Sequence, residues 1–369
     1  MLAPVLLAGV GALVLSIVLT LIVRTLGRRR VLLDSAGSEG HAKELRAVPN
    51  IGGVAIFWSI ALPIGLGLGI ARVWPGVAEI LPAVAEHLEG IREQTPMGLA
   101  LLGCLLVLHV VGLVDDRRPL GPLIKLGVML GTALVMTWGF DARLLEMLDQ
   151  HVGGSWLSIV ITVLWFAAVT NAMNFIDNMD GIAAGIGVVA GSFFLAAAAL
   201  GGQWFVAAAL AVLVGSLLGF LLFNKPRATI FMGDGGSLVL GFLLAFLTVR
   251  TTYLGGPLGS AGYAVFMPLC VLAVPLYDLV AVTVIRLSQG RSPMVGDQQH
   301  LTHRLRARGL SDWQVLAVLC GGTAVTGIGG VLLGQLDGWR ALLIGVQTLL
   351  VLLVLAMYEF ASTRREVSA

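Results

Sequence analysis

The sequence predicts an all-α integral membrane protein with about 10 to 11 transmembrane helices, its N-terminus outside and its C-terminus in the cytoplasm. Of its 369 residues, 57% are apolar and only 12% are charged, whereas soluble domains are about 25% charged. The apolar residues form runs of membrane length, and the basic residues collect in alternate loops. We expect one membrane-embedded domain over residues 1–369.

Eleven apolar spans are expected to cross the bilayer. Their approximate limits are 3–23, 51–71, 97–114, 120–140, 155–172, 181–199, 203–223, 236–250, 262–285, 312–333 and 339–360. The first span lacks a basic start and a clear cleavage site, and Arg24 and Arg28 to Arg30 follow it. It therefore resembles a retained helix more than a cleaved signal peptide.

The basic residues orient these spans. Of the 23 Lys and Arg residues, 18 fall in one set of alternate loops and 5 in the other. The positive-inside rule assigns the larger set to the cytoplasm of a plasma or inner membrane. VGLVDDRRPL, NAMNFIDNMDG, NKPRATIFMGDGGS and the 286–311 loop then lie together, and we expect one cytoplasm-facing cleft. The net charge of +2 and the lack of a basic stripe predict no nucleic-acid partner.

Asp115 and Asp116 end the third span. Adjacent carboxylates repel each other and are costly near lipid, so a bound cation or a basic neighbour is expected. Lys125 and the arginines after Asp116 are candidates for that neighbour. The alternative is a helix-end charge cluster whose arginines lie among lipid headgroups.

Asn171, Asn174, Asp177 and Asp180 recur every three residues. In a continuous helix this spacing makes a polar stripe on one face. The stripe could contact a sugar or nucleotide, or form part of a metal site. The alternative is a polar helix terminus with a loop cap.

Asp234 lies among glycines immediately before the eighth span. Glycines expose backbone N–H groups, and a helix N-terminus attracts phosphate. A lone carboxylate there suits Mg²⁺, which binds few carboxylates together with phosphate oxygens and water. The alternative is an N-cap for the span.

His300 and His303 are three residues apart in the 286–311 loop, and Arg304 follows them. No further His or Cys nearby completes a zinc site. A basic cluster beside a carboxylate-bound cation fits a pyrophosphate, although a basic loop on anionic lipid is the alternative. The four segments together predict Mg²⁺-assisted phosphoryl chemistry on a lipid. His109, in the middle of a span, is expected to be a hydrogen-bonded packing residue.

These segments resemble the polyprenyl-phosphate N-acetylhexosamine-1-phosphate transferases. The matching stretches, in order, are PNIGG (49–53) after a basic loop with His41, Lys43 and Arg46; VGLVDD (111–116); NAMNFIDNMDG (171–181); FNKPRATIFMGDGGS (223–237); PLYD (275–278) with Arg286; and SPMVGDQQHLTHRL (292–305). Each match is of moderate specificity alone, and their common order makes the resemblance strong.

The resemblance implies a reaction, a cofactor and a set of residues. Family members transfer a sugar 1-phosphate from a UDP-sugar to a polyprenyl phosphate and release UMP, with Mg²⁺ or Mn²⁺ and a bundle of ten or eleven helices. The product would start a lipid-linked cell-envelope glycan, and a homodimer is a candidate assembly. The implied catalytic residues are Asp115, Asp116, Asp177 and Asp234, with Asp234 and Asp177 at the metal. The expected substrate contacts are Lys43, Arg46, Lys125, Asn171, Asn174, Asp180, Arg227, His300, His303 and Arg304.

The histidine motif departs from the family pattern. The family loop usually reads H-x-H-H, and here Thr302 replaces the middle histidine. The phospho-MurNAc-pentapeptide translocase branch has three consecutive histidines, so the undecaprenyl-phosphate GlcNAc-1-phosphate transferase branch is favoured, with the translocase as the alternative. A transporter or proton relay is less favoured because the charges gather at one face. An intramembrane aspartyl protease is disfavoured because Phe231 replaces the first glycine of G-x-G-D.

Overall fold

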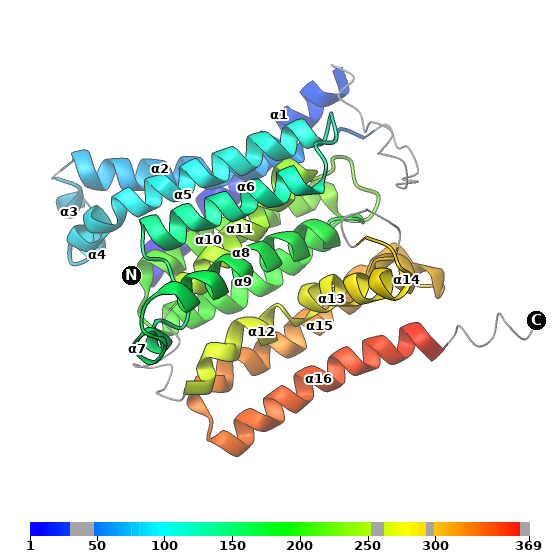
Figure 1. Ribbon diagram of the computed structural model, residues 1–369. Helices are drawn as coiled ribbons and strands as arrows, with labels where there is room; N and C mark the ends of the chain where they lie inside the picture. Colours follow the sequence, from blue (N-terminus) through cyan, green and yellow to red (C-terminus); the bar gives the residue numbers. More distant parts are fainter. Residues whose placement is uncertain (30–47, 75, 81, 252–261, 293–298, 362–369) are drawn as a thin grey trace, which may run out of the picture.

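The computed structural model describes residues 1–29, 48–74, 76–80, 82–251, 262–292 and 299–361, and every regular element in these ranges is a helix (Figure 1). The long helices and the pieces of broken ones are α1 (Leu2–Arg29), α2 (Gly52–Val73), α5 (Leu88–Asp115), α6 (Pro122–Leu134), α8 (Trp156–Ile176), α9 (Ile182–Leu200), α10 (Trp204–Asn224), α11 (Asp234–Arg250), α12 (Met267–Val271), α13 (Ala273–Ser288), α15 (Asp312–Leu332) and α16 (Gly338–Ala361). The short elements are α3 (Val77–Ile80), α4 (Pro82–Ala85), η1 (Val135–Gly139), η2 (Glu146–Leu148), α7 (Asp149–Val152), η4 (Gly262–Phe266), α14 (Leu301–Ala307) and η5 (Leu333–Gln335). The predicted all-α class is confirmed.

All eleven predicted spans coincide with helical segments. Within the described part of the chain, nine helices are long and apolar enough to cross a membrane, and a bent pair raises that number to ten. The remaining predicted span forms α11, which has 17 residues and lies inside the bundle. The protein is therefore a multi-pass membrane protein.

The bent pair corrects the predicted unbroken span at 262–285. The segment from Gly262 to Val271 and helix α13 meet at 70°. Pro275 lies in the first turn of α13, where it has no backbone N–H to donate to the carbonyl of Val271. A proline at this position explains why the helix breaks near Leu272 and does not continue straight.

Helix α11 is the centre of the bundle, surrounded by α8, α5 and α2. Every residue from Gly235 to Thr248 is buried. Close approach to α8 depends on Gly241, where an added Cβ would lie 2.7 Å from the Cα of Thr170. Such burial fits a helix that carries functional groups at one end and touches little lipid.

Helices α1 and α10 also pack closely, through glycines on the facing sides. An added Cβ at Gly215 would lie 2.0 Å from the carbonyl oxygen of Gly9, and one at Gly219 would lie 2.6 Å from that of Leu13. Glycines four residues apart let two membrane helices approach where the hydrophobic effect cannot drive association. In Figure 1, α16 lies at the opposite edge of the bundle from α2.

Candidate active site

The segment before α11 is held by the start of α2 and the residue Pro49 just before it. Gly52 and Gly53 donate their backbone N–H groups to the carbonyls of Phe231 and Met232, both at 2.9 Å. The N–H of Phe231 in turn donates to the carbonyl of Pro49 at 2.9 Å. The PNIGG and IFMGDGG motifs therefore form one paired backbone unit that presents Asp234.

Glycines make this close approach sterically possible. Gly233 has φ +66°, and a Cβ there would lie 2.5 Å from a carboxylate oxygen of Asp116. A Cβ at Gly53 or Gly112 would lie 2.4 Å from the backbone of Gly235 or Asp234, respectively. Any side chain at these positions would separate α2 or α5 from the start of α11.

Asp116 caps α11 from another helix. Its Oδ1 accepts the backbone N–H of Asp234 at 2.9 Å, and its Oδ2 accepts that of Gly235 at 3.2 Å. Asn50 Nδ2 also donates to Oδ1, at 3.2 Å. These contacts satisfy the first N–H groups of α11 and place a negative charge at the positive end of its dipole.

Asp115 faces a different group, the ammonium of Lys125. Lys125 Nζ lies 2.9 Å from Asp115 Oδ2 and 2.8 Å from Asp234 Oδ2, so one lysine bridges two carboxylates. Asp115 Oδ1 accepts the backbone N–H of Leu120 at 2.8 Å. Asn174 donates to Asp234 Oδ1 at 3.0 Å, which brings α8 into the same cluster. We call Asp115, Lys125, Asn174 and Asp234 the carboxylate–lysine cluster.

The carboxylate–lysine cluster has the right donors for a hard divalent cation. Within the described ranges, no group of three or more His, Cys, Asp or Glu side chains converges as metal ligands. Mg²⁺ does not require such a group, because one or two carboxylates with substrate phosphates and water suffice. Asp234 fits an ion that arrives with phosphate oxygens, and it shares its carboxylate with Lys125.

The polar residues at the end of α8 and beyond it do not form one helical stripe, because α8 ends at Ile176. Asn171 donates to the carbonyl of Ala167 at 2.8 Å, on its own helix. Asp177 is the C-cap of α8, about one turn beyond Asn174. Asp180 is buried and lies in the turn before α9.

Asp180 binds the loop that leads to α11. Its Oδ2 accepts the backbone N–H groups of Arg227 and Ala228 at 3.0 and 2.9 Å. Arg227 has φ +71°, an unfavourable value for a residue with a Cβ. Asp180 therefore stabilises a strained turn, as the loop-cap alternative predicts, and the Arg227 side chain is exposed.

The PLYD motif reaches the histidine loop. Asp278 is fully buried in α13, and His300 Nδ1 lies 3.0 Å from its Oδ2. The backbone N–H of Leu301, the first residue of α14, donates to Asp278 Oδ1 at 2.6 Å. A buried carboxylate thus orients the imidazole and caps the short helix that carries His303 and Arg304.

Arg304 connects the histidine loop to the last helix. Its Nε lies 3.0 Å from Glu359 Oε2 on α16, and its Nη2 lies 3.8 Å from Asp278 Oδ1. Arg308 donates to the backbone carbonyl of Glu359. Glu359 is only 5% exposed, so α16 contributes a buried charge to this loop.

Two contacts join the histidine loop to the end of α8. Thr302 donates its hydroxyl to Asn178 Oδ1. The ring of His300 packs edge-on against Phe175, with centroids 5.5 Å apart, and the guanidinium of Arg286 lies 5.9 Å from the same ring. Thr302, at the position where the family usually has a histidine, thus contacts the NAMNFIDNMDG motif.

The structure brings together Asp115, Lys125, Asn174 and Asp234, and it places His300 and Arg304 in a second charged group. Lys43 and Arg46 lie outside the described residues. Asn50 and Glu359, which contact Asp116 and Arg304, were not among the predicted site residues. Their partners are distant in sequence, and only the PNIGG motif pointed toward Asn50.

His109 is a packing residue as expected: its Nδ1 lies 2.7 Å from the Gly235 carbonyl oxygen, and its ring stacks on Phe57.

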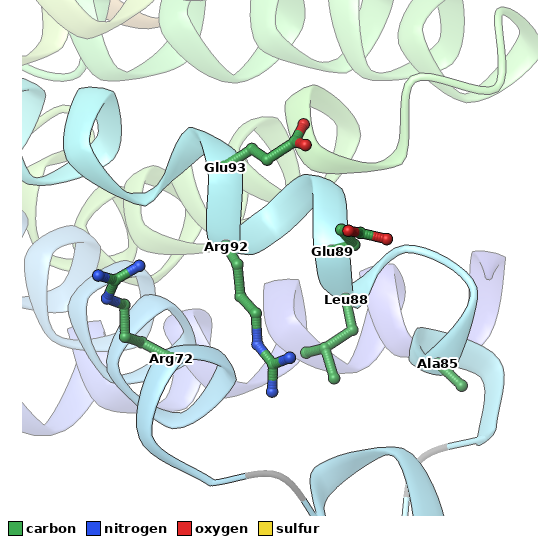
Figure 2. Close-up of a pocket in the computed structure, with 6 residues that line it drawn as sticks. All are labelled: Arg72, Ala85, Leu88, Glu89, Arg92 and Glu93. Atoms are coloured by element: carbon green, nitrogen blue, oxygen red, sulfur yellow. The ribbon is translucent and has the colours of Figure 1, made fainter.

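The opposite end of the bundle carries a separate pocket of about 550 Å³, shown in Figure 2. It is lined by Arg72, Ala85, Leu88, Glu89, Arg92 and Glu93. Arg72 lies about 30 Å along α2 from Gly52, at 1.5 Å per residue. Two arginines and two glutamates balance in charge there, and Arg92 Nε already donates to the Ala71 carbonyl at 2.7 Å. The pocket is remote from the carboxylate–lysine cluster.

Comparison with known proteins identifies the family. The profile of glycosyl transferase family 4 matches residues 98–252, which include Asp115, Lys125, Asn174 and Asp234. A probable undecaprenyl-phosphate N-acetylglucosaminyl 1-phosphate transferase of Bacillus subtilis is 28% identical over 340 residues, covering 91% of this chain and 87% of the relative.

Two further relatives agree. The decaprenyl-phosphate N-acetylglucosaminephosphotransferase of Mycobacterium tuberculosis is 30% identical over 320 residues, covering 79% of this chain and 75% of the relative. The undecaprenyl-phosphate α-N-acetylglucosaminyl 1-phosphate transferase of Thermotoga maritima is 28% identical over 307 residues, with 83% of each chain covered. The chain is therefore a membrane-embedded transferase that belongs to glycosyl transferase family 4.

Proposed function

We propose that this protein transfers GlcNAc 1-phosphate from UDP-GlcNAc to undecaprenyl phosphate or a similar polyprenyl phosphate, and releases UMP. The observation that carries the proposal is the carboxylate–lysine cluster, which joins the end of α5, the starts of α6 and α11 and the last turn of α8. The names of the relatives support both substrates. The lipid product would start a cell-wall or other cell-envelope glycan.

In the proposed reaction, a phosphate oxygen of the lipid attacks the β-phosphorus of the UDP-sugar. A new P–O bond forms, the bond from the β-phosphorus to the bridging oxygen breaks, and UMP leaves with that oxygen. The lipid phosphate is already an anion at neutral pH, so a strong base is not required. The main barrier is the approach of two anions, and fixed positive charge lowers it electrostatically.

The residues of the cluster have distinct proposed roles. Lys125, held between Asp115 and Asp234, would contact the phosphates and offset their charge. Asp234 would hold Mg²⁺ or Mn²⁺, with Asp177 as the second proposed ligand. The bound ion would polarise phosphoryl oxygens and stabilise the charge that develops on them. Asp115 would position the lipid phosphate or accept a proton from it.

The histidine loop is proposed to bind the nucleotide sugar. His300 and Arg304 are positioned by Asp278 and Glu359, so their polar groups are ordered before substrate arrives. Ordered charge-assisted donors suit a pyrophosphate. His303, Arg227, Asp180, Asn171, Lys43 and Arg46 remain proposed substrate contacts. The positive-inside distribution supports a cytoplasmic site.

The test is a UMP-release assay on purified protein with undecaprenyl phosphate, Mg²⁺ and a panel of UDP-sugars. We expect UMP only with lipid acceptor and divalent ion present, and most rapidly with UDP-GlcNAc. Asp234→Asn should abolish transfer, whereas Asp141→Asn, at an exposed residue outside the spans, should not. Absence of UMP with every sugar would refute the transferase proposal, and substrate flux into liposomes without UMP would favour transport.

A further inference from the structure

His109 is a buried histidine that the proposed reaction does not use. It lies in α5, and only 4% of it is exposed. Its Nδ1 lies 2.7 Å from the backbone carbonyl oxygen of Gly235, the residue after Asp234. A carbonyl oxygen only accepts, so Nδ1 carries the hydrogen and donates it. The imidazole therefore binds the first turn of α11, next to the carboxylate–lysine cluster.

One face of α5 follows the start of α11. Gly112 and Asp116 come three and seven residues after His109, a spacing that puts all three on the same side of a helix. Gly112 lets the two backbones touch, because an added Cβ would lie 2.5 Å from the backbone nitrogen of Gly235. His109 and Asp116 lie on either side of this contact, about 10.5 Å apart along the axis of α5.

The two side chains hold Gly235 from opposite directions. Its N–H donates to Asp116 Oδ2 at 3.2 Å, and its carbonyl accepts from His109 at 2.7 Å. In an α-helix the N–H groups point toward the N-terminus and the carbonyls toward the C-terminus. A slide of α11 along α5 in either direction would therefore lengthen one of the two hydrogen bonds.

The imidazole is itself held in place by α2. Its ring lies parallel to that of Phe57, with centroids 4.6 Å apart and an angle of 6° between the planes. Phenylalanine or leucine would fill the same apolar space, so packing alone does not require a histidine. A buried polar side chain in a membrane helix is costly unless it is hydrogen-bonded. The feature that distinguishes His109 is therefore its donor to Gly235.

We infer that His109 is a positioning residue that fixes the register of α11 against α5, and with it the separation of Asp234 from Asp115. The inference rests on the proposed function, in which these two carboxylates act on the metal ion and the lipid phosphate. Lys125 bridges them at 2.9 and 2.8 Å, so a small slide of α11 would break the bridge. His109 acts through the Gly235 carbonyl and touches no substrate.

The test separates the donor from the ring. His109→Phe keeps a ring that stacks on Phe57 and loses the donor. His109→Asn loses the ring and keeps an amide N–H near the position of Nδ1. His109→Gln carries the same amide one methylene further out, and its comparison with His109→Asn decides the test if His109→Phe does not fold. The control is His151→Phe, at an exposed histidine whose Nδ1 lies 3.2 Å from the carbonyl oxygen of Met147.

The full-length variants are compared in UMP release, in thermal unfolding and in hydrogen–deuterium exchange of the peptide that contains Asp234 and Gly235. We expect His109→Phe to lower kcat by roughly ten- to a hundredfold, because a misplacement of about 1 Å costs up to about a hundredfold. KM for UDP-GlcNAc should change little, since the histidine loop stays in place, and exchange in the peptide should become faster. His109→Asn should recover most of kcat and slow the exchange again, whereas His109→Gln should not. The control should match the wild-type protein.

Three results would overturn the inference. One is wild-type kcat and exchange in His109→Phe. Another is a lower kcat in His109→Asn than in His109→Phe, which would mean that the ring matters and the donor does not. The third is equal recovery by His109→Gln, which would mean that the position of the donor is unimportant. Failure of the wild-type protein to release UMP would instead refute the proposed function, and the exchange rates would still test the register of α11.

Discussion

Lys125 is the residue whose replacement should show most directly how the site works. Its ammonium is the shared partner of Asp115 and Asp234, at 2.9 and 2.8 Å. Lys125→Met keeps an unbranched side chain of similar length and removes the positive charge. The two carboxylates would then face each other, and the incoming phosphates, without their common counter-ion.

The expected loss follows from how deeply these groups lie. The side chains of Lys125, Asp115 and Asp234 are 22%, 13% and 24% exposed, so most of the surface of each is buried. Removing one partner of a buried ion pair costs about 3 to 5 kcal/mol, and an exposed pair contributes less than about 1 kcal/mol. Removing a positioned group that stabilises charge in the transition state costs about 3 kcal/mol, which corresponds to a loss of roughly a hundredfold in kcat/KM.

The assay is UMP release by wild-type protein, Lys125→Met, Lys125→Arg and the control Lys225→Met, at a lysine that is exposed at the end of α10. Thermal unfolding of each variant separates loss of fold from loss of activity. The arginine variant should retain part of the activity because it keeps the charge but not the ammonium geometry. A folded Lys125→Met within threefold of wild-type activity would refute this account of the site.

Other contacts give predictions of different kinds. Asp278→Asn weakens the contacts that orient His300. We expect KM for UDP-GlcNAc to rise about tenfold, or about 1.4 kcal/mol, with a smaller change in kcat. An unchanged KM would mean that His300 does not bind the nucleotide sugar. Asp180→Ala leaves two backbone N–H groups without their acceptor. The free energy of unfolding, measured by heat or denaturant, should fall by about 1 to 3 kcal/mol. An unchanged free energy of unfolding would contradict the capping role. Gly112→Ala forces a Cβ to within 2.4 Å of the Asp234 backbone. The rate of UMP release should fall, and the free energy of unfolding should fall by about 1 to 3 kcal/mol. A fully active variant would mean that α5 can shift freely against α11.

The membrane class and helix positions could be predicted because they depend on local composition. A run of apolar residues must form a helix in lipid, since every backbone group needs an internal partner. The break near Leu272 could not be predicted in the same way, although Pro275 is visible in the sequence, because many membrane helices tolerate a proline. The predicted polar stripe on one helix face was wrong for a related reason. Three-residue spacing implies a face only where the helix continues, and α8 ends at Ile176.

The partners within the site could not be predicted from local patterns. Lys125 and Asp234 are 109 residues apart, and Asn50 and Asp116 are 66 apart. Which lysine meets which carboxylate depends on how α5, α6 and α11 pack, and sequence spacing does not encode that directly. Glu359 is the extreme case: it lies in the last helix, away from every motif, and it meets Arg304 only because α16 packs beside the histidine loop.

The adjacent aspartates illustrate why packing decides chemistry. Consecutive residues at a helix end project about 100° apart, so Asp115 and Asp116 cannot share one environment. Asp116 turns to the start of α11 and accepts hydrogen bonds from two N–H groups there. Asp115 turns to Lys125 on α6. One carboxylate thus fixes the helix that presents Asp234, while its neighbour pairs with Lys125, and two adjacent carboxylates become compatible with the membrane because each has its own hydrogen-bond donors.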